Sequence, residues 1–165
     1  MKRIIVALLL TILAATPALA GKKVINIASD CTWPPMEFVN KDKQIVGFSV
    51  DLMKACAKAA GYEVKIKNVA WDGIFAGLAA GKYDAICSSV SINEKRKKVM
   101  DFAEPYFEVQ QSVVTAKDST AKTLADFKGM NVGAQIGTTG YFAIKGVEGV
   151  IPKSYDEIGL AMEDL

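Results

Sequence analysis

The sequence predicts an α/β fold built on a mostly parallel sheet. Short apolar segments of strand length alternate with amphipathic segments of helix length from residue 24 to the end of the chain. This alternation is typical of β-α units, in which each helix returns the chain to the same sheet. Gly61, Gly81 and Gly129 follow three of the expected helical segments, where a glycine commonly ends a helix.

The first half of the chain is expected to form one α/β lobe over residues 21–108. Asp51 and Asp72 are expected at the starts of two helices, and Asn93 is expected to cap a third, basic helix. In chain order, the pattern predicts strands at 24–28, 62–69 and 84–87 and helices at 51–60, 71–80 and 94–99.

The second half predicts the start of another lobe over residues 109–165. Thr123 with Asp126, and Ser154 with Glu157, have the spacing of helix-capping boxes. The predicted elements are an extended segment at 109–116, a helix start at 123–126, a strand at 131–135, a helix at 138–145, a strand at 149–151 and a helix at 155–165.

The N-terminus has the pattern of a cleaved secretory signal. Lys2 and Arg3 precede an apolar run at 4–13, and Ala18-Leu19-Ala20 has the form of a cleavage site. The run is shorter than the roughly 20 residues that span a bilayer, so a removable signal is expected rather than an anchor. Cleavage after Ala20 and a periplasmic location are therefore predicted.

Charge and composition exclude several functions. Lys2 and Arg3 account for the net charge of +2. Removal of residues 1–20 therefore leaves a chain of 145 residues with no net charge, which argues against nucleic acid or an anionic membrane as the main partner. The chain has no His, which excludes a His-dependent triad or a His-ligated zinc, and no cofactor or metal is expected. Cys31, Cys56 and Cys87 have no metal-like spacing; at least one of them is expected to be a small buried residue, and a disulfide between two of them stays open.

Candidate binding residues follow the predicted strands. Asp30 and Trp33 come after the first strand, at the sheet edge where ligands collect in open α/β folds. Taken alone, each also fits a loop residue or a hydrophobic plug. Arg96 lies in the first turn of the basic helix, where a guanidinium can pair with a carboxylate. Hydroxyl groups gather near two predicted helix starts, at Ser88, Ser89 and Ser91 in the first half and at Thr138 and Thr139 in the second.

Several of these residues lie in a series of motifs that resembles the periplasmic solute-binding proteins of polar amino-acid ABC importers, bacterial solute-binding protein family 3. The resemblance begins at residue 24 and runs to the end of the chain. Its motifs are GFSVDL at 47–52, WDGI at 71–74, GKYDAI at 81–86, SSVSINEKR at 88–96, DFAEPY at 101–106 and DFKG at 126–129. It implies a two-lobed Venus-flytrap fold that closes on its ligand by a hinge motion.

The resemblance also implies how the backbone end of an amino acid would be held. Arg96 would pair with the α-carboxylate, together with the backbone N–H and hydroxyl of Thr139. Ser89 and Ser91 would accept the α-ammonium through a carbonyl and a hydroxyl group.

The ligand side chain would lie between two tryptophans. Trp33 and Trp71 would form the two walls of this slot, and Asp30 would reach the polar end of the side chain. The expected protein is a monomeric, non-enzymatic receptor that passes a polar or basic L-amino acid to the permease subunits of an ABC importer in the inner membrane.

Two alternatives use the same fold. One is a periplasmic dehydratase acting on prephenate or arogenate, for which Glu37 is the nearest candidate acid besides Asp30. The other is a ligand-binding module of a sensor. Family members continue well beyond this length, so the second lobe is expected to be incomplete and the chain truncated at its C-terminus. Asn93 stands where the family usually has Thr, and both residues cap helices well.

Overall fold

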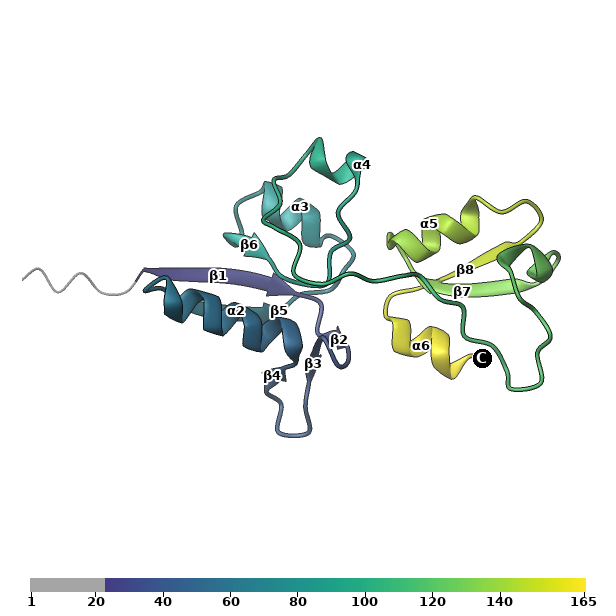
Figure 1. Ribbon diagram of the computed structural model, residues 1–165, viewed down its shortest axis with the longest axis horizontal. Coiled ribbons are helices and arrows are strands. Elements are labelled where there is room, and N and C mark those ends of the chain that lie inside the picture. Colours follow the sequence, from purple (N-terminus) through teal and green to yellow (C-terminus); the bar gives the residue numbers. More distant parts are fainter. Residues whose placement is uncertain (1–22) are drawn as a thin grey trace, which may run out of the picture.

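A computed structural model describes residues 23–165, and the predicted signal segment at 1–20 lies outside these residues. The described chain has the predicted α/β fold, arranged in two lobes (Figure 1). The first lobe contains the elements from β1 to α4, and the second contains those from η1 to α6. A segment without regular secondary structure, residues 101–116, leads from one lobe to the other.

A parallel three-stranded sheet organises the first lobe. Its strand order is β5-β1-β6, with Ile27 of β1 aligned with Ile66 on one side and Ala85 on the other. Helix α2 lies along one side of β1, and α3 and α4 lie on the other (Figure 1). The elements are β1 (Val24–Ser29), α2 (Phe48–Ala59), β5 (Glu63–Asn68), α3 (Ile74–Ala79), β6 (Ala85–Ile86) and α4 (Glu94–Lys97).

A second, antiparallel sheet follows β1 and was not predicted. Its strands are β2 (Thr32–Trp33), β3 (Glu37–Val39) and β4 (Ile45–Val46), in the order β2-β3-β4. Strands of two or three residues are too short to show a period in sequence. This sheet places Trp33 directly across from Glu37.

The second lobe is built on two parallel strands, β7 (Asn131–Gln135) and β8 (Ile151–Tyr155). Helices α5 (Thr139–Lys145) and α6 (Ile158–Glu163) lie on opposite sides of this pair (Figure 1). A short 3-10 helix, η1 (Leu124–Phe127), precedes β7 and has the predicted capping box of Thr123 and Asp126.

Two predicted helix starts in the first lobe are wrong. Helix α2 begins at Phe48, so Asp51 lies in its first turn instead of capping it. Gly47 precedes it with φ 128°, and a side chain there would clash with the carbonyl of Met36. Helix α3 begins at Ile74, because the chain turns from Trp71 through a left-handed Gly73 first.

The boundary between the last strand and the last helix was also predicted wrongly. Ser154 and Tyr155 belong to β8, and α6 begins only at Ile158. Parallel pairing with β7 continues to the register of Gln135 with Tyr155. This pairing supplies backbone hydrogen bonds that the local capping pattern of Ser154 and Glu157 does not outweigh.

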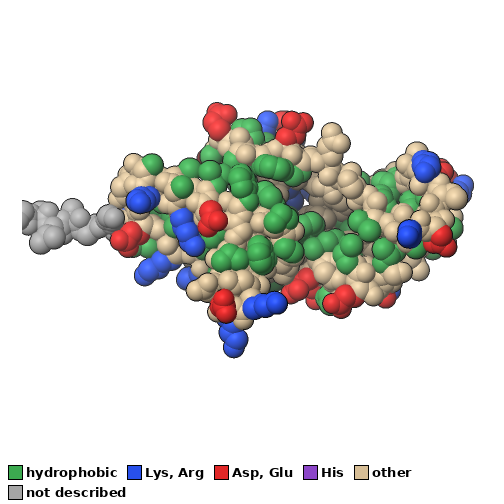
Figure 2. Space-filling view, turned by 60° about the horizontal axis from the view of Figure 1, so that its bottom comes forward, with side chains coloured by type: hydrophobic (Ala, Val, Ile, Leu, Met, Phe, Trp, Pro, Cys, Tyr) green, Lys and Arg blue, Asp and Glu red, His purple; other side chains and the backbone are tan. Residues whose placement is uncertain are grey.

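Each lobe has its own apolar core. Ala28, Trp71, Ile74 and Tyr83 form the first. The second core consists of Val132, Ala134, Ile144 and Val150. Figure 2 shows hydrophobic side chains gathered over the middle of one face, with most charged side chains towards its margins. Within residues 23–165, no helix has the length and apolarity needed to cross a membrane.

Candidate ligand-binding site

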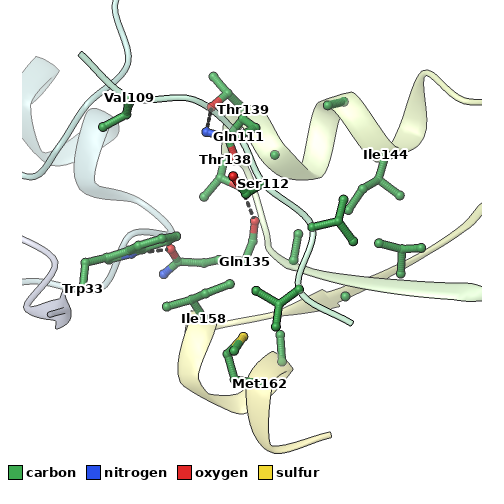
Figure 3. Close-up of a pocket in the computed structure, with 18 of the residues that line it drawn as sticks. Trp33, Val109, Gln111, Ser112, Gln135, Thr138, Thr139, Ile144, Ile158 and Met162 are labelled. Atoms are coloured by element: carbon green, nitrogen blue, oxygen red, sulfur yellow. Dashed lines mark hydrogen bonds between the residues drawn. The ribbon is translucent and has the colours of Figure 1, made fainter. Parts of the chain in front are cut away.

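A cavity of about 730 Å³ is lined by side chains from both lobes and from the segment that joins them. Figure 3 shows Trp33 and Gln135 pointing toward one another and joined by a hydrogen bond, with Ile158 and Met162 of α6 below. All the predicted site residues except Asp30 line this cavity: Trp33, Trp71, Ser88, Ser89, Ser91, Arg96, Thr138 and Thr139.

Arg96 is held at the cavity by its backbone, a carbonyl and two aromatic rings. Asn93 caps α4 as predicted, because its side-chain oxygen accepts from the Arg96 backbone N–H at 2.9 Å. The guanidinium donates to the Ser91 carbonyl oxygen at 2.9 Å. Its central carbon lies 4.9 Å from the ring centre of Phe75 and 5.4 Å from that of Trp71, within cation-π range. Burial lowers the pKa of Arg96, although a guanidinium stays protonated at neutral pH.

Residues 88–91, which contain Ser88, Ser89 and Ser91, form a loop called here the serine loop. Several hydrogen bonds join this loop and Arg96 to the second lobe. Arg96 Nη2 lies 3.5 Å from the carbonyl oxygen of Gly137, and the hydroxyls of Ser91 and Thr139 are 3.3 Å apart. The connecting segment adds Gln111, whose side-chain amide donates to the Thr139 hydroxyl at 3.2 Å. The groups predicted to hold the backbone end of an amino acid thus lie together at one place.

The two predicted helix-end sites are weaker than the sequence suggested. Helix α4 has four residues and α5 has seven, and a helix dipole is the sum of its aligned peptide units. Thr138 caps α5 by accepting from the Tyr141 N–H, and its hydroxyl donates to the Gln135 carbonyl. An anion at this place would therefore depend mainly on the Arg96 side chain.

Asp30 is buried behind the cavity wall, with an exposed fraction of 1%. Its backbone N–H donates to the Ser88 hydroxyl at 2.8 Å. Its carboxylate accepts one hydrogen bond from the Thr32 hydroxyl at 2.8 Å and one from Gln135 Nε2 at 2.7 Å. Gln135 therefore stands between Asp30 and the space in which a ligand would lie.

Gln135 joins the two lobes at the other end of the cavity. Its side-chain oxygen accepts from Trp33 Nε1 at 2.9 Å (Figure 3). Its amide also donates to the Asp156 carbonyl at 2.8 Å. Trp33, Asp156 and Asp30 are thus three hydrogen-bond partners of the fully buried Gln135 side chain. Gln135 was not predicted as a site residue, although its place at the carboxyl end of a strand, two positions before the GTTG sequence at 137–140, is a signal for one.

The two tryptophans both reach the cavity but have different surroundings. Trp33 is half-buried, and its indole N–H donates to the side-chain oxygen of Gln135. Trp71 is buried and meets Phe75 edge to face, with ring centres 5.1 Å apart. Phe75 was not singled out from the sequence beyond its place in a predicted helix, yet it contacts both Trp71 and Arg96.

The cysteines are not part of this site. All three are free, with Cys31 and Cys87 buried and Cys56 exposed. Burial raises the pKa of the Cys31 thiol, and it raises that of Cys87 to about 11. In the described part of the chain, no three metal-ligating side chains of the His, Cys, Asp and Glu types gather at one place.

Comparison with known proteins identifies the family of the chain. Residues 25–162 match the family of bacterial extracellular solute-binding proteins, family 3. A probable histidine-binding protein of Neisseria gonorrhoeae is 39% identical over 132 residues, which cover 79% of this chain and 49% of that protein. The ABC transporter arginine-binding protein 1 of Escherichia coli (strain K12) is 39% identical over 139 residues, covering 84% of this chain and 56% of the relative.

A solved structure gives the same result for the fold. An ancestral arginine-binding protein bound to arginine superposes with a TM-score of 0.83 at 37% identity, covering 87% of this chain and 66% of that one. The chain thus spans about half the length of the curated relatives it matches. By its motifs, its fold and these matches, the chain belongs to the bacterial extracellular solute-binding proteins of family 3.

Proposed function

We propose that this protein is a binding receptor that captures a polar or basic L-amino acid between two lobes, residues 21–108 and 109–165. The observation that carries the proposal is Arg96, whose guanidinium lies against the rings of both Trp71 and Phe75 and lines the cavity beside Ser91 and Thr139. A guanidinium that is fixed in this way binds a carboxylate with two parallel hydrogen bonds. The cavity volume of about 730 Å³ suits a small molecule.

The two ends of the ligand would be held by different residues. The α-carboxylate would pair with Arg96 and the backbone N–H and hydroxyl of Thr139. The α-ammonium would be accepted by Ser89 and Ser91, whose loop lines the cavity.

The side-chain end favours a basic ligand. Asp30 is buried, and both hydrogen bonds to its carboxylate come from neutral groups, Thr32 and Gln135. A buried carboxylate is stabilised by a cation. The guanidinium or ammonium group of a ligand that displaces Gln135 from Asp30 would provide that charge, while Trp33 and Trp71 flank its aliphatic part. Relatives named as histidine-binding and arginine-binding proteins are consistent with this choice.

Export and delivery complete the proposal. The signal segment would be cleaved after Ala20, and the monomeric receptor would work in the periplasm, passing its ligand to the permease subunits of an ABC importer. N-terminal sequencing of the exported protein tests the cleavage: Gly21 as first residue supports it, and retention of Met1 contradicts it.

A calorimetric screen of the twenty amino acids against the purified protein tests binding. At least one polar or basic L-amino acid should bind, and Arg96→Ala should weaken it about a hundredfold, because a charged hydrogen-bonded contact is lost. Lys98→Ala is the matched control, since it removes a positive charge from an exposed residue next to the same helix. No binding of any amino acid, or equal losses in the two variants, contradicts the proposal.

A further inference from the structure

Glu37 is a fully buried carboxylic residue behind the ligand-binding site. It lies in β3, directly across from Trp33 of β2, and its exposed fraction is 0%. Neither of its carboxyl oxygens has a hydrogen-bond partner among the described residues. An acid that is buried to this degree without a partner is destabilising unless its protonation state or its neighbours compensate.

The groups that face Glu37 come from several segments of the first lobe and from the connecting segment. Four of them are themselves acidic: Asp30, Cys31, Cys87 and Tyr106. No cation is among the groups that act on the Glu37 carboxyl, and burial raises its pKa. Two hydroxyls close to it, those of Ser49 and Ser89, partly offset this rise in pKa.

The two serines lie in different local structures, a left-handed loop residue and the first turn of a helix. Ser89 has φ 46°, an uncommon left-handed conformation for a residue other than glycine, and its buried hydroxyl has no hydrogen-bond partner within residues 23–165. Ser49 lies in the first turn of α2, and its hydroxyl is 3.2 Å from that of Tyr106 in the connecting segment. Glu37 thus lies between the serine loop of the binding site and the segment that leads to the second lobe.

We propose that Glu37 is a proton-dependent positioning residue: its protonated carboxyl group bonds the Ser89 and Ser49 hydroxyls and so fixes the serine loop against the connecting segment. The consequence for affinity rests on the proposed function, since it is the serine loop that would hold the amino acid. A protonated carboxyl donates one hydrogen bond and accepts others, whereas the ionised form only accepts and carries a charge that no cation compensates.

The sign of the pH dependence follows from the raised pKa. Because the folded-state pKa lies above the ordinary value of 4.5, the unfolded chain loses this proton at a lower pH than the folded protein. The contribution of Glu37 to stability is therefore complete below pH 4.5 and is lost as the pH rises through the folded-state pKa. Ionised Glu37 can still accept from the serine hydroxyls, but it carries a buried charge that no cation compensates, and this charge destabilises the packing of the serine loop over the same range.

The test compares the wild type with Glu37→Gln, which keeps a neutral side chain of the same size at every pH. The first readout needs no ligand: the infrared C=O band of a protonated carboxylic acid should be present at the acidic end of the pH range, disappear as the pH rises through the folded-state pKa, and be missing in the variant. The second is thermal unfolding over the same range, whose decline with pH should be smaller in Glu37→Gln. Glu63→Gln, an exposed position on β5, is the control and should keep the wild-type profile.

The third readout is the affinity for L-arginine as a probe. The wild type should bind about tenfold more weakly at the alkaline end of the range, whereas Glu37→Gln should show a flat profile and Glu37→Ala weak binding throughout. A missing infrared band in the wild type, or the same pH profiles in the wild type and Glu37→Gln, overturns the proposal. If no amino acid binds the wild type, the proposed function fails, and the infrared and unfolding readouts still decide the role of Glu37.

Discussion

The indole N–H of Trp33 donates to the side-chain oxygen of Gln135 at 2.9 Å, although 102 positions separate them in the sequence. Trp33 follows the first strand of one lobe, and Gln135 ends the first strand of the other. The same glutamine donates to Asp30 at 2.7 Å, so that one side chain links two residues of the opposite lobe. The contact between the lobes is therefore made of directional polar bonds in a buried place, which makes it sensitive to single substitutions.

Replacing Gln135 with Leu should destabilise the protein by about 3 kcal/mol, because Asp30 and the Trp33 indole would stay buried without their partner. Urea unfolding measures this free-energy change. The control is Gln44→Leu, at an exposed turn position, which should change the free energy of unfolding by less than about 0.5 kcal/mol. Equal effects of the two substitutions would show that the Gln135 bonds contribute nothing specific.

Replacing Phe75 with Leu should weaken the binding of L-arginine about fivefold while leaving the fold in place. Leucine retains apolar contact with the first core but removes the ring that faces the Arg96 guanidinium at 4.9 Å. Calorimetry measures the affinity. Phe142→Leu removes the ring below Lys95 instead and serves as the control. An unchanged affinity in Phe75→Leu would show that the Phe75 ring does not contribute to binding.

Replacing Asn93 with Ala should reduce stability by about 1 kcal/mol, the usual effect of losing a helix cap. It should also weaken amino-acid binding, because the Asn93 side chain fixes the backbone N–H of Arg96 itself. Asn93→Asp retains the capping oxygen and should restore both properties. Thermal unfolding and calorimetry on the two variants provide the measurement, and a failure of Asp to rescue would argue against the cap as the cause.

A thiol count under native conditions should find one fast-reacting cysteine. Cys56 is exposed, whereas Cys31 and Cys87 are buried, and the raised pKa of the Cys87 thiol, about 11, leaves little reactive thiolate at neutral pH. Alkylation followed by mass spectrometry should label Cys56 first and all three only after denaturation. Only one reactive thiol after denaturation would reveal a disulfide and contradict the structure.

Strong local signals in the sequence predicted much of the fold correctly. The Asn93 cap and the Thr123 capping box lie where expected, because each depends on a few neighbouring residues. The end of β8 was predicted wrongly for the opposite reason. Its last two residues, Ser154 and Tyr155, are in a strand because β7 lies beside them, and no local pattern reports that contact.

The binding site could be predicted only in part. Eight of the nine proposed side chains line one cavity, since motif and strand position both pointed to them. Asp30 lies behind the wall because Gln135 reaches it from the other lobe, a contact over 105 positions that the sequence does not display. Phe75 and Glu37 were missed as supporting residues because their importance comes from what packs beside them.

The central claim is that Arg96 recognises the carboxylate of a bound amino acid. Calorimetry with L-arginine and with agmatine, its analogue without the carboxylate, tests it in the wild type and in Arg96→Ala. Removing the carboxylate from the ligand and removing the Arg96 side chain should each weaken binding about a hundredfold. The two losses should not add, so Arg96→Ala should bind agmatine about as well as the wild type does. If Arg96→Ala weakens agmatine as much as it weakens L-arginine, the guanidinium does not contact the carboxylate and the claim is wrong.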